Sequence, residues 1–266
     1  MTSQDELFAD RYARQAKFVG VGEQGQRRIE AGNVLVVGSG GLGSALVNLL
    51  ARAGVGRITV VDFDVVAASN LPRQLLFGEA EVIAGAPKAV AAAEAVRLIN
   101  STIEVTPVVA KVTADNILGL VAGKDLVLDA TDNLPARYLI NDACVKLGVP
   151  WVYGGVVASN GMSTTIIPGE TACFRCLFPY DGTIDPPPTC ATVGVLASIV
   201  VIVAALQWTS AIKLLVGDRE HINRGVTYID VWTNDQLTSE PVQPDPDCPC
   251  CGQHRYDFLK VPTTLL

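Results

Sequence analysis

Short apolar runs alternate with segments of helical periodicity along the first half of the chain. NVLVVG (Asn33–Gly38) is a continuous apolar run, typical of a strand buried on both faces, and RITVVD, IEVTPVV, DLVLDA and WVYGGV predict four further strands. The intervening segments LGSALVNLLARAG, PKAVAAAEAVRLIN and LPARYLINDACVKLG predict helices, two of which end in glycine. This alternation predicts an α/β fold with a mainly parallel sheet and helices on both faces.

The pattern changes after about Gly155. GMSTTIIP alternates as in a strand with one exposed face, and VTYIDVW with QLTSEPVQP predicts a C-terminal pair of antiparallel strands. Residues 181–189, DGTIDPPPT, predict a proline-rich loop. Residues 191–212 carry no charge and are long enough to cross a membrane, but polar side chains interrupt the run and no second span accompanies it. We therefore expect a buried core helix there.

Composition narrows the classes of function. The net charge is −7 with no long run of one sign, which gives no support to nucleic-acid binding. The N-terminal segment MTSQDELFADRYARQ is charged and lacks the apolar core of a secretory signal, so we expect a cytoplasmic protein. In that compartment the seven cysteines are interpreted as thiols or metal ligands rather than disulfides.

A glycine-rich turn follows the first predicted strand. GSGGLGS (Gly38–Ser44) opens a helix, where glycines let the backbone approach a phosphate and the helix N-terminus offers free N–H groups, as in a Rossmann-like fold. Such a turn serves NAD, FAD, ATP or S-adenosylmethionine equally. Asp62, at the end of the second strand, is placed to accept hydrogen bonds from ribose hydroxyls. Up to this point an NAD enzyme also fits.

Cationic and amide residues nearby favour a triphosphate. Arg73 could clamp phosphates through its planar fork, and Lys88 could act as a point charge. Asp132, just past the fourth strand, could hold Mg²⁺ together with phosphate oxygens. The predicted nucleotide site comprises Gly38, Gly40, Gly41, Gly43, Asp62, Asp64, Asn70, Arg73, Gln74, Lys88 and Asp132.

The cysteines form two C-x₂-C pairs, whose four thiolates would satisfy a tetrahedral, structural zinc. The pairs are Cys173 with Cys176 and Cys248 with Cys251. Cys250 leaves the last ligand open, and redox disulfides are the alternative to zinc. Cys190 stands apart before the apolar helix, where a helix N-terminus lowers a thiol pKa; it is either a nucleophile or a packing residue.

Together these residues resemble the ThiF/MoeB/HesA family, the bacterial relatives of ubiquitin-activating enzymes. Its motifs occur in the family's order from Arg11 to Gly252: RYARQ, GSGGLGS, VDFDVV, SNLPRQ, PK, DATDN, CFRC, CATVGVL and CPCCG. Pro72 departs from the usual SNLQRQ, while Asn70 and Arg73 keep their spacing. The resemblance implies one adenylation domain over residues 1–266, with a nucleotide-binding part at about 30–155 and a carrier-binding, crossover-loop and zinc part at about 156–252.

The family resemblance implies an ATP-dependent adenylyltransferase. Its substrate would be the C-terminal glycine of a small ubiquitin-like sulfur carrier ending in Gly-Gly, with release of pyrophosphate, in molybdopterin, thiamin or thiolated-tRNA synthesis. It implies these catalytic and binding roles: ribose for Asp62, phosphates for Arg73 and Lys88, the reacting phosphate region for Asn70, and magnesium for Asp132.

The resemblance also implies contacts beyond the chain's own pocket. Arg14 would reach the phosphates of the neighbouring subunit as an arginine finger, so a homodimer is expected. The loop at 181–189 would cross over the carrier's tail, and Cys190 would take up the activated carrier in some members but not in others. No rhodanese-like segment follows the last cysteines, so a separate protein would donate sulfur.

Three alternatives stay open on the sequence. The same fold could activate another carboxylate, such as a peptide terminus, or serve a tRNA-modifying cyclase. An NAD-dependent oxidoreductase is disfavoured by Arg73, Lys88 and Asp132. A zinc-stapled scaffold would bind a ubiquitin-like protein without turnover.

Overall fold

The computed structural model describes residues 10–180 and 190–260, with backbone only at residues 190 and 191. Its centre is one eight-stranded sheet in the order β3-β2-β1-β4-β5-β6-β7-β8. The first five strands pair in parallel and the last three pair antiparallel, which confirms the predicted α/β sheet. Their bounds are Asn33–Val37, Arg57–Val61, Glu104–Val108, Leu126–Asp129, Trp151–Val157, Asn160–Ile166, Thr227–Asp230 and Asp235–Thr238 for β1 to β8.

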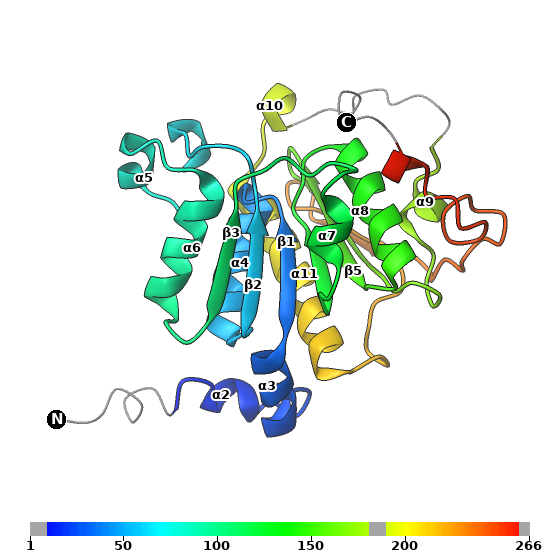
Figure 1. Ribbon diagram of the computed structural model, residues 1–266, viewed down its shortest axis with the longest axis horizontal. Coiled ribbons are helices and arrows are strands. Elements are labelled where there is room, and N and C mark those ends of the chain that lie inside the picture. Colours follow the sequence, from blue (N-terminus) through cyan, green and yellow to red (C-terminus); the bar gives the residue numbers. More distant parts are fainter. Residues whose placement is uncertain (1–9, 181–189, 261–266) are drawn as a thin grey trace.

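Helices cover both faces of the sheet (Figure 1). One face packs against α4 (Gly41–Ala53), α6 (Lys88–Ile99) and α11 (Ala197–Val216), and the other against α7 (Ile117–Val121), α8 (Leu134–Leu147) and α9 (Phe174–Leu177). Each layer buries an apolar cluster, as a two-faced sheet requires.

The two edges of the parallel strands carry different segments. At the amino edge lie α2 (Ala13–Ala16) and α3 (Gly22–Ala31), which Figure 1 shows at the foot of the strands. At the opposite end of the molecule, Figure 1 shows α10 (Cys190–Val193). The connection from β2 to α6 contains the short helices η1 (Ala68–Asn70) and α5 (Glu79–Ile83). The loops that follow β1, β2 and β4 meet at the carboxyl edge, because these strands are parallel neighbours in the sheet.

The apolar helix differs from its predicted bounds. Instead of one helix over 191–212, α10 ends at Val193 and α11 begins at Ala197. Gly194 has φ +79°, and the segment around it bonds to the β5–β6 turn, because Ala158 N donates to Gly194 O and Leu196 N donates to Ala158 O. These bonds end α10 and restart the helix. α11 then continues past the predicted end to Val216.

Within the described residues, α11 is the one helix long and apolar enough to cross a membrane by length and composition. In the structure it packs against α4, β5 and β6. It is therefore a core helix on the side that faces the sheet, whereas Val201 and Ile202 on its other side are exposed.

One other expectation needs correction. β6 does not keep one face exposed: residues 163–166 are all buried, because β6 lies between β5 and β7 and is covered by α11. The C-terminal residues, which carry little sequence signal, include η2 (Asp257–Lys260), whose Phe258 is buried against α8. The division into two functional parts at residue 155 stays a prediction, and β5 extends across that boundary.

Candidate functional site

A cavity of about 430 Å³ opens at the carboxyl edge of the parallel strands. It brings together almost the whole predicted nucleotide site. The predicted residues that line it are Gly38, Gly40, Gly41, Asp62, Asp64, Asn70, Arg73, Gln74, Lys88 and Asp132. Their assembly follows from topology, since β1, β2 and β4 are neighbours and their carboxyl ends share one edge.

The glycines of the first turn meet different constraints. Gly38 has φ +94°, and a Cβ there would lie 2.6 Å from Ala130 O. A Cβ at Gly43 would lie 2.0 Å from Gly38 O, so this glycine allows close packing of α4 on the turn and does not line the cavity. A Cβ at Gly40 would find its nearest atom 3.9 Å away, at Gln74 Nε2. Gly40 therefore leaves room on the cavity side of the turn.

Asp62 ties the turn to the second strand. Its carboxylate accepts hydrogen bonds from the backbone N–H of Ser39 at 2.6 Å and of Asp64 at 2.8 Å. Burial raises the pKa of Asp62, while these two N–H donors and Lys88 act in the opposite direction. A carboxylate has about four acceptor positions, so two bonds leave capacity for ribose hydroxyls.

The predicted cations differ in exposure and in partners. Lys88 is buried, and its Nζ lies 2.8 Å from Asp64 Oδ2, which is half exposed at the cavity wall. Arg73 is half-buried and donates from Nη1 to Ser69 O at 2.9 Å. Asn70 accepts from Ala67 N at 3.1 Å and so shapes the short helix η1 that carries the motif. Both cations face the same cavity.

Gln74 is the buried amide of the cavity wall. Its side chain is 2% exposed, and its Oε1 has no hydrogen-bond partner among the described residues. An unpaired buried amide oxygen is costly, and such groups are common at binding sites. This observation supports a binding role for Gln74.

Asp132 lies in the loop between β4 and α8. It is exposed, and next to it Asn133 begins α8 by accepting from Ala136 N at 3.0 Å. A single carboxylate at a cavity that also holds phosphate-binding groups fits Mg²⁺, which is bound through one or two carboxylates plus phosphate oxygens and water.

Several residues of the cavity were not predicted. Phe63 follows Asp62 and is 59% exposed, Lys111 comes from the loop after β3, and Val200 comes from α11. The position of Phe63 and Lys111 after strand ends is a signal that the sequence could have given. Val200 could not be found that way, because α11 reaches the cavity only through tertiary packing.

Arg14 lies at the opposite edge of the sheet from its own cavity. Neighbouring residues of α2 are anchored there: Tyr12 Oη accepts from Asn100 Nδ2 at 2.7 Å, and Gln15 Nε2 donates to Ala53 O at 3.0 Å. Both contacts are with residues at the ends of helices that start at the cavity edge. Arg14 itself is exposed and is not among the cavity residues.

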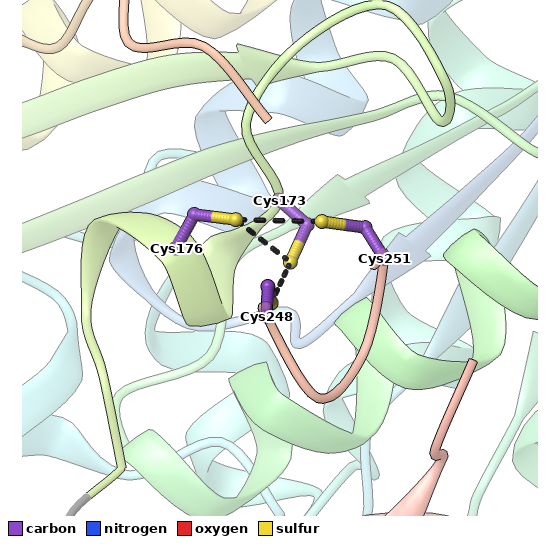
Figure 2. A group of neighbouring side chains, drawn as sticks. All are labelled: Cys173, Cys176, Cys248 and Cys251. Carbon is purple, nitrogen blue, oxygen red and sulfur yellow. Dashed lines mark hydrogen bonds between the residues drawn. The ribbon is translucent and has the colours of Figure 1, made fainter. Parts of the chain in front are cut away.

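Four cysteine sulfurs form a separate cluster. Figure 2 shows the side chains of Cys173, Cys176, Cys248 and Cys251 turned toward one another. Their Sγ atoms all lie within 4.8 Å of one another. Three Sγ···Sγ distances are 3.4, 3.6 and 3.9 Å. A tetrahedral zinc with Zn–S bonds of about 2.3 Å requires sulfur separations of about 3.8 Å. The donor set and its spacing therefore fit a closed, structural zinc site.

Cys250 lies outside this cluster. Its thiol is buried and accepts from Asn141 Nδ2 at 3.2 Å, while Cys251 Sγ lies 3.4 Å from Cys176 Sγ. The geometry favours Cys251 as the fourth ligand. The loop at 181–189 and the Cys190 side chain lie outside the described residues, so their predicted roles stay predictions.

Comparison with known proteins identifies the family to which this chain belongs. The model of the ThiF family matches residues 12–250. The chain belongs to the ThiF family. It is 41% identical over 260 residues to the SAMP-activating enzyme E1 of Haloferax volcanii, covering 97% of this chain and 94% of that protein. It is 39% identical to the sulfur carrier protein ThiS adenylyltransferase of Bacillus subtilis, covering 94% of this chain and 73% of that protein.

Solved structures share the fold of this chain. MccB of E. coli, in complex with MccA-N7isoASN, superimposes with a TM-score of 0.78 at 22% identity, covering 94% of this chain and 75% of MccB. At that identity the likeness concerns the fold alone.

Proposed function

We propose that this ThiF-family protein adenylates the C-terminal glycine of a ubiquitin-like sulfur carrier with ATP and releases pyrophosphate. Its relatives include a protein named as a sulfur carrier adenylyltransferase. The observation that carries the proposal is the single cavity shared by Asp62, Arg73, Lys88 and Asp132. A ribose acceptor, two phosphate-binding cations and one exposed carboxylate are what Mg-ATP requires, and NAD does not need the last three.

In this proposal the residues bind and orient ATP so that its α-phosphate faces the carrier's carboxylate. The incoming carboxylate oxygen forms a bond to the α-phosphorus, and the bond to the pyrophosphate oxygen breaks. Asp62 holds the ribose, Arg73 and Lys88 neutralise phosphate charge, and Asn70 lies beside the reacting phosphate. Mg²⁺ held by Asp132 would supply charge neutralisation at the phosphate oxygens. The attacking group is already a carboxylate, so no general base is needed.

Lys88 can bind a phosphate while it keeps Asp64 as a partner. In the structure its Nζ lies 2.8 Å from Asp64 Oδ2, and an ammonium group has two further donors for phosphate oxygens. Because Lys88 is buried and its charge is screened little by solvent, its attraction for a phosphate contributes to nucleotide affinity.

The homodimer expectation gains support from α11. Val201, Ile202 and Ala205 are exposed apolar residues on one side of this helix, at three- and four-residue spacing. The N-terminal part of α11 supplies Val200 to the cavity, whereas its last turn, at Val216, packs against α3. The helix is about 30 Å long and thus joins the two edges of the sheet.

We propose that two copies pack through this side of α11 about a two-fold axis. Antiparallel helices would then place the α2–α3 end of one subunit beside the cavity of the other. That arrangement supports the role of Arg14 as an arginine finger across the interface, because Arg14 cannot reach its own cavity from the opposite edge.

Three further assignments belong to the proposal. Zinc held by the four cysteines is structural, since four thiolates leave no open position. The protein acts in the cytoplasm, away from membranes and nucleic acids. The loop at 181–189 guides the carrier's tail, and Cys190 is not required for adenylation.

The decisive experiment is ATP–pyrophosphate exchange with small Gly-Gly-ending carriers added one at a time. We expect exchange that depends on one carrier, and we expect Arg73→Ala and Asp132→Ala to reduce it more than 100-fold, because each removes charge neutralisation at the phosphates. Zinc content and oligomeric state serve as controls for folding.

The outcomes separate the alternatives. Tight ATP binding without exchange for any carrier would point to another carboxylate substrate. Saturable nicotinamide binding would revive the oxidoreductase, and carrier binding without turnover would favour a scaffold. Near wild-type exchange in either variant would refute the site assignment.

A further inference from the structure

Thr131, the residue before Asp132, is held at three backbone and side-chain atoms. Its N–H and its hydroxyl both donate to Asp129 Oδ1, at 2.9 and 2.6 Å. Its carbonyl accepts from Arg137 Nη2 at 2.9 Å. A loop residue bonded at its N–H, C=O and side chain has little freedom to move, and Asp132 is the next residue in the chain.

The two residues that hold Thr131 are themselves buried and paired. Asp129 is 0% exposed, and its Oδ2 lies 3.4 Å from Arg137 Nε, an ion pair that is not aligned as a hydrogen bond. Arg137, from the first turns of α8, also lies over the ring of Tyr153 at 5.1 Å. The guanidinium thus joins β4, α8 and β5 beneath the loop.

Gln207 of α11 holds the backbone of Asp129 from the opposite face of the sheet. Its Nε2 donates to Asp129 O at 2.7 Å and to Val152 O at 3.2 Å. These bonds bridge β4 and β5 where the two strands stop pairing after Leu128 and Val152. Asp129 is therefore held at both its backbone and its side chain.

We propose that Arg137, acting through Asp129 and Thr131, is a positioning residue that holds the Asp132 carboxylate at the cavity for the divalent cation of a bound nucleotide. This inference rests on the proposed function for the identity of the nucleotide. The buried Asp129–Arg137 pair fixes the position of Thr131, and the position of Thr131 fixes that of the neighbouring Asp132. Groups that orient a metal ligand in this way typically change metal affinity 10- to 100-fold.

A matched control exists in the same protein. Arg175 is buried like Arg137, pairs with the fully buried Asp142 at 3.5 Å and lies over the ring of Phe258. It lies in α9, beside the cysteine cluster, and is not among the cavity residues. Replacing Arg175 tests what the loss of a buried arginine does at a place away from the nucleotide cavity.

The experiment is a Mn²⁺ titration, by electron paramagnetic resonance, of the protein saturated with a non-hydrolysable ATP analogue. Arg137→Lys keeps a charge opposite Asp129 but loses the fork that also reaches Thr131 O. We expect it to weaken Mn²⁺ binding about 10- to 100-fold, while nucleotide binding without metal stays within about twofold of wild type. Arg175→Lys should lower the Tm without changing Mn²⁺ binding.

A second pair of variants covers the case in which Arg137→Lys does not fold. Thr131→Ser keeps the hydroxyl that donates to Asp129, whereas Thr131→Val removes it at nearly the same volume. We expect Mn²⁺ affinity to fall only in the valine variant. In exchange assays, high Mg²⁺ should restore much of the rate of Arg137→Lys.

Equal Mn²⁺ affinity in wild type and Arg137→Lys, or equal losses in Arg137→Lys and Arg175→Lys, would overturn the positioning role. The same holds if the serine and valine variants behave alike. The titration needs no carrier protein. A wild-type protein that binds Mn²⁺ and nucleotide but shows no carrier-dependent exchange would therefore refute the proposed function and leave this inference standing.

Discussion

At the scale of the residue, the glycine turn shows how one motif combines two requirements. Gly43 is needed because a side chain would collide with the carbonyl oxygen of Gly38, and Gly40 because the backbone must stay open to the cavity. Both are glycine, but one serves the fold and the other serves the ligand. Alanine substitutions can separate these two needs.

We expect Gly43→Ala to destabilise the protein by at least about 1–3 kcal/mol, since its Cβ would lie 2.0 Å from Gly38 O and the turn must move. Gly40→Ala should change stability by less than about 1 kcal/mol, because its Cβ meets nothing within 3.9 Å, yet lower ATP affinity about tenfold or more. Thermal unfolding and nucleotide titration measure the two effects. The reverse pattern would show that the two roles are misassigned.

Much of the nucleotide cavity could be predicted residue by residue from the sequence. The carboxyl ends of parallel strands lie at one edge of the sheet, so glycines, acids and cations that follow these strands meet there. Asp62 and Asp132 could be placed at the cavity in this way. The Asp129–Arg137 pair could not be found this way. It depends on the crossing of α8 over β4, and a buried arginine in an amphipathic helix resembles a surface charge in sequence.

At the scale of the element, periodicity predicted the strands and most long helices, but tertiary hydrogen bonds decided where the apolar helix is interrupted. The break between α10 and α11 arises from backbone bonds between Gly194, Leu196 and the distant Ala158. The C-terminal segment has little regular structure after β8. It is joined to α9 by the cysteine cluster and to α8 by Phe258, contacts that a local pattern does not reveal.

We therefore expect the loss of zinc from the cysteine cluster to loosen the C-terminal segment before the rest of the protein. We expect Cys176→Ser and Cys251→Ser to lose most of the bound zinc and to raise amide hydrogen exchange in residues 248–258, because the tie to α9 is lost. Cys250→Ser is the matched control and should retain about one zinc per chain. Zinc retained by Cys251→Ser but lost by Cys250→Ser would reverse the ligand assignment.

At the scale of the whole molecule, the placement of Arg14 gives a complementation test. Arg14→Ala and Asp132→Ala homodimers should both be nearly inactive. A heterodimer of the two has one intact cavity, the one with Asp132 present and Arg14 supplied by the other chain. Random mixing makes half of the dimers mixed, so about a quarter of wild-type activity should return.

Recovery would need subunit exchange, which a tagged copy can verify. No recovery despite verified exchange would show that Arg14 does not act across the interface. A charged substitution at Val201 should separate the subunits, because this residue lies on the exposed apolar side of α11. Sedimentation of that variant checks the surface independently of activity.

α11 lines the cavity through Val200, holds Asp129 through Gln207 and carries the surface proposed to meet the second subunit. In the proposed dimer, this helix would line the cavity of its own subunit and contact the matching helix of the other. A shift of α11 that favours nucleotide in one subunit would then be transmitted to the helix packed against it, and the two proposed ATP sites would be thermodynamically linked. Successive ATP molecules would bind with unequal affinities, and the sign of the cooperativity would show whether the enzyme works with both sites in step or in turn.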